Sequence, residues 1–151
     1  FVDGDDWLLY KESLEFVRKV YADNNVWATY GSYVSRLGRS CICRSVDLSE
    51  GVRKQILNGW PFSHLRTFKA FLWDELEESD FRDSNGELFT AAVDVAIMTP
   101  ILELCGNRIG YIKNPLYFYN DGTGNNIQDV RLQDQARCAI EIAGRPAREK
   151  L

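Results

Sequence analysis

The sequence lacks the residue patterns that build zinc sites and disulfide frameworks. It has one histidine, His64, and four cysteines without a Cys-x-x-Cys pair among them. Structural zinc sites usually take cysteine or histidine ligands from closely spaced pairs. We therefore expect free thiols that are mostly buried. We also expect no disulfides, because no secretory signal opens the sequence.

Two further absences limit the partners. No apolar run approaches the roughly 20 residues that span a bilayer. The chain also has no basic block, and its formal net charge is −4. Nucleic-acid binding depends on clustered lysine and arginine that neutralise phosphates. We therefore expect no nucleic-acid partner and no integral membrane segment, and a cytoplasmic protein, free or peripheral to a membrane.

The apolar pattern that is present predicts an α/β fold. A chain of 151 residues, 45% apolar, can form one core, so we treat residues 1–151 as a single domain. Helical spacing predicts helices over 12–21, 50–57, 66–76, 90–104 and 126–142. Extended patterns predict strands at 26–30 and 33–34, weakly at 40–46, and as a hairpin-like pair at 108–112 and 116–119. This order of elements is typical of α/β proteins.

Proline and glycine refine the helix boundaries. Pro100 removes a backbone donor, so we expect a kink or an early start in the helix over 90–104. Gly106 should end that helix. A solvated tail is expected after Gly144. At the other end, Phe1-Val2 looks like the end of a buried strand, so we expect further sequence upstream.

Three aspartates lie within four residues directly after that apolar start. They are Asp3, Asp5 and Asp6, with Gly4 after the first. Their mutual repulsion can be neutralised by backbone donors or by a hard cation such as Mg²⁺ or Mn²⁺, which leaves positions open for substrate phosphates. Gly4 can adopt a backbone conformation that other residues resist. The alternative is that Asp5 or Asp6 caps a helix starting at Trp7.

Four blocks of the sequence together resemble glycosyltransferase family 2. They are FVDGDDWL at 1–8, HLRTFK at 64–69, VDVAIMTP at 93–100 followed by Leu102-Glu103, and RIGYI at 108–112 followed by PLYFYN at 115–120. Their order and spacing match the C-terminal half of that family's catalytic domain. The resemblance covers residues 1 to about 126 and leaves 127–151 as a C-terminal helix and tail.

The resemblance implies a GT-A fold, the Rossmann-like fold of nucleotide-diphospho-sugar transferases. Its first half holds the nucleotide and ends at the D-x-D motif, so the fold is expected to be incomplete here, without the N-terminal nucleotide-binding strands. The implied activity is an inverting glycosyltransferase of the hexosyltransferase class, with a nucleotide-sugar donor, most often a UDP-sugar. The acceptor is a carbohydrate on a glycan, a lipid-linked sugar or a protein. If the nucleotide-binding half is truly absent, the isolated chain is expected to bind the donor poorly, and loss of activity is one outcome.

The resemblance also assigns roles to the acidic residues. Asp3 and Asp5 are implied to hold the divalent cation, Mn²⁺ or Mg²⁺, and through it the donor diphosphate; Asp5 is the more direct ligand. Asp6 is implied to be a cap or a contact to the donor sugar. Many enzymes of this fold take a third metal ligand, often histidine, from the C-terminal region. This chain has no histidine after His64, so water, a donor oxygen or a side chain within 125–129 would replace it.

Two further sites follow from the other blocks. His64 and Arg66 are placed where positive groups meet the diphosphate or an acceptor hydroxyl. The alternative is that Arg66 and Lys69 form a solvated helix face and that His64 is the neighbour of a helix N-terminal cap. Asp94 is the implied general base that deprotonates the acceptor hydroxyl. The alternative is that Asp94 only caps the helix that follows it.

Two rival functions stay open. One is a non-catalytic carbohydrate-binding or scaffolding module that kept the fold and lost the chemistry. The other is a Mg²⁺-dependent phosphotransfer enzyme, which we rank lower because the ordered set of Asp, Lys and Ser or Thr that it needs is not recognisable. Trp60 and Tyr30 are candidate sugar-stacking walls, with core packing as the alternative.

Overall fold

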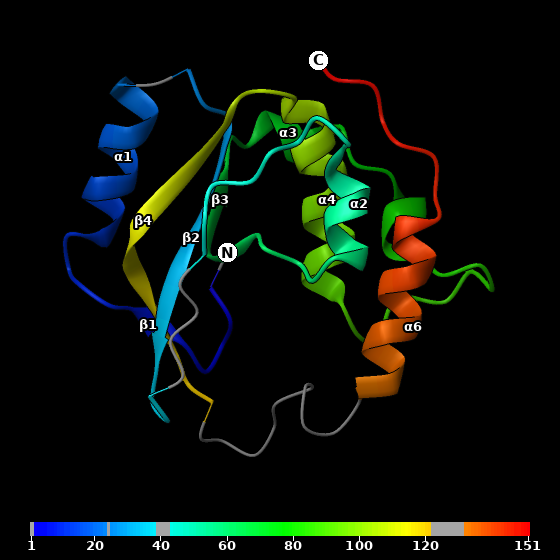
Figure 1. Ribbon diagram of the computed structural model, residues 1–151, viewed down its shortest axis with the longest axis horizontal. Coiled ribbons are helices and arrows are strands. Elements are labelled where there is room, and N and C mark those ends of the chain that lie inside the picture. The colour runs from blue at the N-terminus through cyan, green and yellow to red at the C-terminus, as the bar shows by residue number, and fades with distance from the viewer. Residues whose placement is uncertain (1, 24, 39–42, 122–131) are drawn as a thin grey trace. The chain divides into compact units, whose positions relative to one another are not determined.

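A computed structural model describes residues 2–23, 25–38, 43–121 and 132–151. These residues form two compact units (Figure 1). The sheet unit comprises the described residues within 1–46, 61–69 and 107–124, and the helical unit those within 47–60, 70–106 and 125–151. A mixed four-stranded sheet accompanied by helices confirms the α/β class.

The sheet unit is built on strands in the order β1-β4-β2-β3. They are β1 Trp7–Leu8, β2 Ala28–Ser35, β3 Ser63–Phe68 and β4 Ile109–Tyr119. The central pair, β2 and β4, is parallel, and both outer pairs are antiparallel. The short edge strand β1 continues directly from the aspartates at the start of the chain, so the sheet fixes where they lie.

The hairpin predicted around Asn114-Pro115 is wrong, because both halves belong to β4. Between two paired stretches, β2 advances only from Gly31 to Tyr33 while β4 advances from Ile112 to Tyr117. The extra residues of β4 form an irregularity at Asn114-Pro115, where proline cannot donate a ladder hydrogen bond. The sequence signal for a turn therefore marks an interruption within one long strand.

The two extended pieces predicted at 26–30 and 33–34 are likewise one strand, β2, that continues through Gly31. A Cβ atom at Gly31 would lie 3.0 Å from the carbonyl oxygen of Ile112 and 3.3 Å from that of His64. Both neighbouring strands thus approach β2 closely here, and glycine is the residue that permits the approach.

The helix predicted over 66–76 is wrong. Its first part is strand β3, which pairs with β2, and only Phe71–Asp74 is helical, as α3. The pairing is reinforced by a contact between the Thr29 and Thr67 hydroxyl groups, at 2.5 Å, and by the Tyr21 hydroxyl 2.9 Å from Thr67. Long-range pairing of this kind overrides the helical spacing of the apolar residues.

Helix α1, Ser13–Asp23, agrees with the predicted helix and packs on the sheet beside β4 (Figure 1). Its Val17 joins a core cluster of Leu65, Ile112, Leu116 and Tyr117. Complete burial of an apolar side chain of this size contributes about 1.5–3 kcal/mol. Leu14, which the spacing places on the same stripe, is instead 59% exposed.

The start of the chain differs from two expectations. Val2 is 50% exposed and lies outside any strand, so no buried strand ends there; Phe1 lies outside the described residues. Trp7 begins β1 rather than a helix, which excludes the helix-capping alternative for Asp5 and Asp6. Gly4 also does not have a positive φ, and no heavy atom would lie within 4 Å of a Cβ there. Its special backbone freedom is therefore not used.

The helical unit contains five helical segments in its described part. They are α2 Val52–Leu57, α3 Phe71–Asp74, the 3₁₀ helix η1 Glu78–Phe81, α4 Val93–Cys105 and α6 Leu132–Ala143. The predictions of α2 and α4 are confirmed, and so is the end of α4 at Gly106, which has φ 57°. Helix α4 runs through Pro100. Of the predicted helix over 126–142, residues 126–131 lie outside the described part.

A core cluster joins the helices of this unit. Its buried members are Ile56, Phe89, Ala91, Ala92, Val95, Ala96, Cys138 and Ile142. Trp60 packs against this cluster, so the core alternative holds for it. The described cysteines, Cys43, Cys105 and Cys138, are buried free thiols as predicted, and Cys41 lies outside the described residues.

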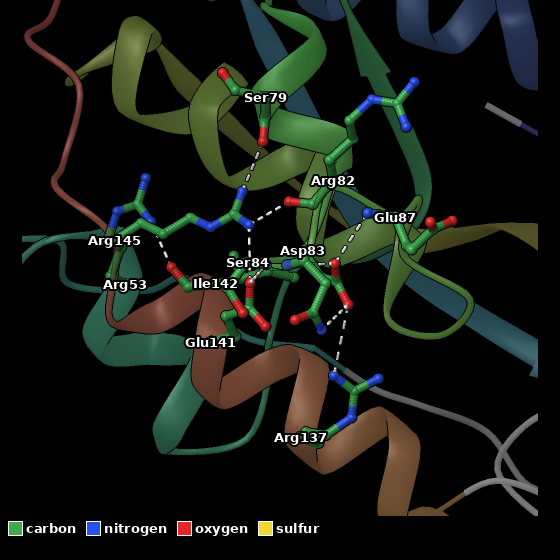
Figure 2. Close-up of polar contacts among 11 residues, drawn as sticks. Arg53, Ser79, Arg82, Asp83, Ser84, Glu87, Arg137, Glu141, Ile142 and Arg145 are labelled. Carbon is green, nitrogen blue, oxygen red and sulfur yellow. Dashed lines mark hydrogen bonds and ion pairs between the residues drawn. The ribbon is translucent and has the colours of Figure 1, made fainter.

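The C-terminal tail is not simply solvated, contrary to expectation. Arg145 donates hydrogen bonds to the backbone carbonyl groups of Ser79, at 2.9 Å, and Arg82 (Figure 2). Arg148 donates to the Asp80 carboxylate at 2.7 Å. Because these bonds satisfy backbone carbonyls and carboxylates at once, the tail is attached to the loop around η1.

Candidate functional site

Asp3, Gly4, Asp5 and Asp6 form the acidic turn of the sheet unit. The backbone N–H of Asp6 donates to the Asp3 carbonyl oxygen at 3.1 Å and closes the turn. The side chains differ in environment, since Asp5 is exposed whereas Asp3 and Asp6 are half-buried. Strand β1 follows at once, so its pairing with β4 holds the C-terminal end of the turn.

The hydroxyl group of Tyr117 joins the two ends of the acidic turn. It accepts a hydrogen bond from the backbone N–H of Asp3 at 3.0 Å and donates one to Oδ2 of Asp6 at 2.7 Å. The other Asp6 oxygen, Oδ1, accepts from the backbone N–H of Asn120 at 2.7 Å. Both oxygens of the Asp6 carboxylate are thus held by donors from β4 and the residue that follows it.

The register of β1 against β4 explains why Tyr117 reaches the turn. Leu8 is opposite Tyr117, and Trp7 is opposite Phe118. The Trp7 and Phe118 rings stack with centroids 4.3 Å apart. Because side chains alternate across a strand, Tyr117 points to the other face from Phe118. There it is completely buried.

His64 and Arg66 lie on β3 and are buried. The solvated-helix alternative is therefore wrong for Arg66, and the alternative of a helix-cap neighbour is wrong for His64. The His64 ring stacks on Tyr117 with centroids 4.4 Å apart. Nη2 of Arg66 is 3.2 Å from each ring nitrogen of His64. Burial, and then the charge of Arg66, lowers the pKa of His64 to about 3. His64 is therefore neutral at ordinary pH, and the buried positive charge of this block is that of Arg66. Lys69 is exposed.

The neighbouring tyrosines stay protonated. Burial raises the pKa of Tyr117, so its hydroxyl always has a proton to donate to Asp6. Burial also raises the pKa of Tyr119 to about 12, followed by the negative charge of Asp6. Tyr119 therefore experiences the electrostatic potential of the acidic turn, although the two are far apart in the sequence.

The sheet unit thus brings together most of the residues singled out in the sequence. Asp3, Asp6, His64 and Arg66 are linked through Tyr117. Asp94 belongs to the helical unit. It is half-buried in the first turn of α4, after the N-cap residue Ala92, which has φ 52°. The N-cap alternative for Asp94 is therefore wrong.

The acidic turn supplies carboxylates, the ligand type that a hard divalent cation prefers. Among the described residues, no group of three or more His, Cys, Asp or Glu side chains could hold a metal ion. Mg²⁺ is usually held by only one or two carboxylates, with substrate phosphates and water completing its shell. Asp3 and Asp5 supply two carboxylates. The two oxygens of the Asp6 carboxylate accept hydrogen bonds from Tyr117 and from the Asn120 backbone. The replacement ligand expected within 125–129 lies outside the described residues.

Tyr117 and Asn120 belong to the sequence block PLYFYN at 115–120, but the sequence alone assigned them no role. The available signal was the alternation in Tyr117-Phe118-Tyr119, which places two hydroxyl groups on one face of a strand. Tyr30, a candidate sugar wall, is only 3% exposed, and its hydroxyl donates to the Arg44 carbonyl at 2.9 Å. It is a core residue.

Comparisons with protein-family models, with curated proteins and with solved structures found no match for this chain. In the part of the chain that the structure describes, no helix is both long and apolar enough to cross a membrane.

Proposed function

We propose that this chain is the acceptor-side part of a metal-assisted, inverting glycosyltransferase with a GT-A fold. The observation that carries the proposal is the link from Asp6 through Tyr117 to His64. It joins three of the four blocks on which the resemblance to glycosyltransferase family 2 rests, although they are distant in the sequence. Packing of an apolar core does not by itself require a tyrosine hydroxyl group that is hydrogen-bonded to an acidic turn.

The acidic turn would bind the donor. Asp3 and Asp5 would hold Mn²⁺ or Mg²⁺, which when bound offsets the charge that develops on the leaving nucleotide diphosphate. Asp6 keeps the turn in place through Tyr117 and Asn120. Arg66 supplies the positive charge of the β3 block, whereas His64 contributes a neutral ring.

The transfer itself is a single displacement at the anomeric carbon of a nucleotide sugar, a UDP-sugar in the first instance. The acceptor hydroxyl oxygen forms the new bond to that carbon while the bond to the diphosphate oxygen breaks, which inverts the configuration. Asp94 takes the hydroxyl proton as general base. The acceptor is a carbohydrate hydroxyl on a glycan, a lipid-linked sugar or a protein.

A thermal-shift panel tests this proposal. The chain is heated with UDP, GDP and their sugars, with and without Mn²⁺, beside the variant Asp5→Asn. Asp74→Asn, an exposed aspartate of α3, is the matched control. We expect a Mn²⁺-dependent rise in Tm with one nucleotide, retained in Asp74→Asn and lost in Asp5→Asn. A Tm shift that does not need Mn²⁺, or that persists in Asp5→Asn, contradicts the assignment of the donor site. Binding of free sugars alone would favour the non-catalytic carbohydrate-binding module.

A further inference from the structure

We propose that Tyr117 is a positioning residue for the metal site: its hydroxyl group holds the acidic turn in the shape in which Asp3 and Asp5 bind a divalent cation. The inference rests on the proposed function, which assigns the ion to these two carboxylates. It adds a residue that the sequence did not single out, and it makes Asp6 a second positioning residue.

The geometry of the hydrogen bonds is the first step. A single hydroxyl group accepts from the backbone N–H of Asp3 and donates to the carboxylate of Asp6. These two residues are the ends of the acidic turn, and Asp5 lies between them. Fixing both ends restricts the orientations of the two metal-binding carboxylates before any ion arrives.

The rigidity of Tyr117 is the second step. Its side chain is 0% exposed, it lies in β4 opposite Leu8, and the His64 ring is stacked on it at an interplanar angle of 12°. The hydroxyl group is therefore placed by the sheet and not by the turn.

The demands of the ion are the third step. Mg²⁺ requires near-ideal octahedral geometry, and a site supplied by only two carboxylates depends strongly on where they point. The Asp6 carboxylate already accepts from Tyr117 and from the Asn120 backbone. It therefore acts on the ion by fixing the turn, and loss of the Tyr117 hydroxyl should weaken metal binding although that hydroxyl is not itself a ligand.

The chain provides a matched control in Tyr30. Tyr30 and Tyr117 are both buried in the sheet unit, at 3% and 0% exposure. Each hydroxyl accepts from a backbone N–H at 3.0 Å, of Val46 and of Asp3 respectively. Each also donates one bond, Tyr30 to the Arg44 carbonyl oxygen and Tyr117 to the Asp6 carboxylate, so each Phe variant removes a buried hydroxyl group that both accepts and donates. Only Tyr117 is bonded to the acidic turn.

The experiment measures Mn²⁺ binding directly, by the loss of the free-ion electron paramagnetic resonance signal, without donor or acceptor. All variants are compared at a temperature at which circular dichroism shows them folded. We expect Tyr117→Phe to raise the Kd for Mn²⁺ at least tenfold, Tyr30→Phe to leave it within about twofold, and Asp5→Asn to abolish binding. Asp6→Glu, which keeps the charge but displaces the carboxylate, should weaken binding as Tyr117→Phe does; it also serves if Tyr117→Phe does not fold.

The other outcomes contradict either the positioning role of Tyr117 alone or the metal site together with it. If Asp5→Asn loses Mn²⁺ while Tyr117→Phe and Asp6→Glu bind normally, the positioning role is wrong and the proposed metal site stands. If both tyrosine variants weaken binding equally, the hydroxyl acts only through general stability, and the positioning role is again wrong. If the unmodified chain does not bind Mn²⁺, or if Asp5→Asn binds it unchanged, the metal site and the positioning role both fail.

Discussion

The imidazole ring of His64 lies nearly parallel to the phenol ring of Tyr117, with an angle of 12° and a centroid separation of 4.4 Å. The rings of Tyr33 and Tyr119 are also close, at 5.9 Å and 5.8 Å. Burial of the imidazole, and then the charge of the nearby guanidinium of Arg66, disfavour the protonated ring. The pKa of His64 accordingly falls from 6.5 to about 3.

The first prediction is a dependence of stability on pH. Because the folded-state pKa is lower than the unfolded one, the unfolded chain binds the extra proton between these values. Stability is therefore complete above about pH 6.5 and declines as pH falls towards about 3, with a slope approaching roughly 1.4 kcal/mol per pH unit. Urea unfolding between about pH 7 and 5 measures it, above the range in which most carboxylates titrate.

The matched variant for this prediction is His64→Phe, which keeps an aromatic ring against Tyr117 but cannot be protonated. Its stability should be nearly independent of pH over the same window. If the original chain and His64→Phe show the same slope, His64 is not buried in its neutral form.

The second prediction concerns the close approach of strands at Gly31. A Cβ at this position would meet the Ile112 carbonyl oxygen at 3.0 Å, and backbone atoms cannot move aside cheaply. We expect Gly31→Ala to lower the free energy of unfolding by about 1–3 kcal/mol. Gly4→Ala is the control, because its Cβ would have no heavy atom within 4 Å, and we expect a change within about 0.5 kcal/mol. Equal effects on the urea midpoint would contradict the steric explanation.

Local signals were sufficient for the elements that depend on local contacts. Helix α1 follows from the spacing of Val17 and Val20, and α4 from a long apolar run that Gly106 ends. They were not sufficient for the sheet. In β3, apolar residues at helical spacing adopt an extended conformation because they pair with β2, which is distant in the sequence. In β4, the turn signal of Asn114-Pro115 is overruled because both halves pair with β2.

The candidate site shows the same division. The sequence identified the acidic turn and the block of His64, because short motifs carry them. It did not reveal that the Asp6 carboxylate accepts a hydrogen bond from Tyr117, which lies 111 residues further along the chain. Nor could it show that His64 is neutral, since the pKa depends on burial and on Arg66. Such properties arise from tertiary packing and have no local pattern.

The third prediction concerns the ion pair of Glu103 and Arg53 in the helical unit. Nε and Nη2 of Arg53 donate to the two Glu103 oxygens at 2.7 Å and 2.9 Å, and Glu103 is only 9% exposed. Glu103→Ala leaves the guanidinium of Arg53, whose side chain is only 14% exposed, without its counter-charge. We expect a loss of about 3–5 kcal/mol in urea unfolding.

The double variant Arg53→Met, Glu103→Leu is the control for that pair. Removing both charges avoids the uncompensated one, so it should cost much less than Glu103→Ala. A double variant as unstable as the single one would show that packing, and not charge, dominates at this position.

The fourth prediction tests the proposed general base. Asp94→Asn keeps the size of the side chain in the first turn of α4 but cannot accept the acceptor proton. We expect transfer from the donor to fall by about 10²–10⁴-fold, with Mn²⁺-dependent nucleotide binding and Tm nearly unchanged. Asp134→Asn is the matched control, since Asp134 is a half-buried aspartate in the first turn of α6 and its substitution removes the same helix-dipole interaction. If Asp94→Asn transfers sugar as fast as Asp134→Asn, the proton goes to another group. If only Asp94→Asn is slow and its donor affinity is intact, the loss lies in the chemical step, as expected for a general base.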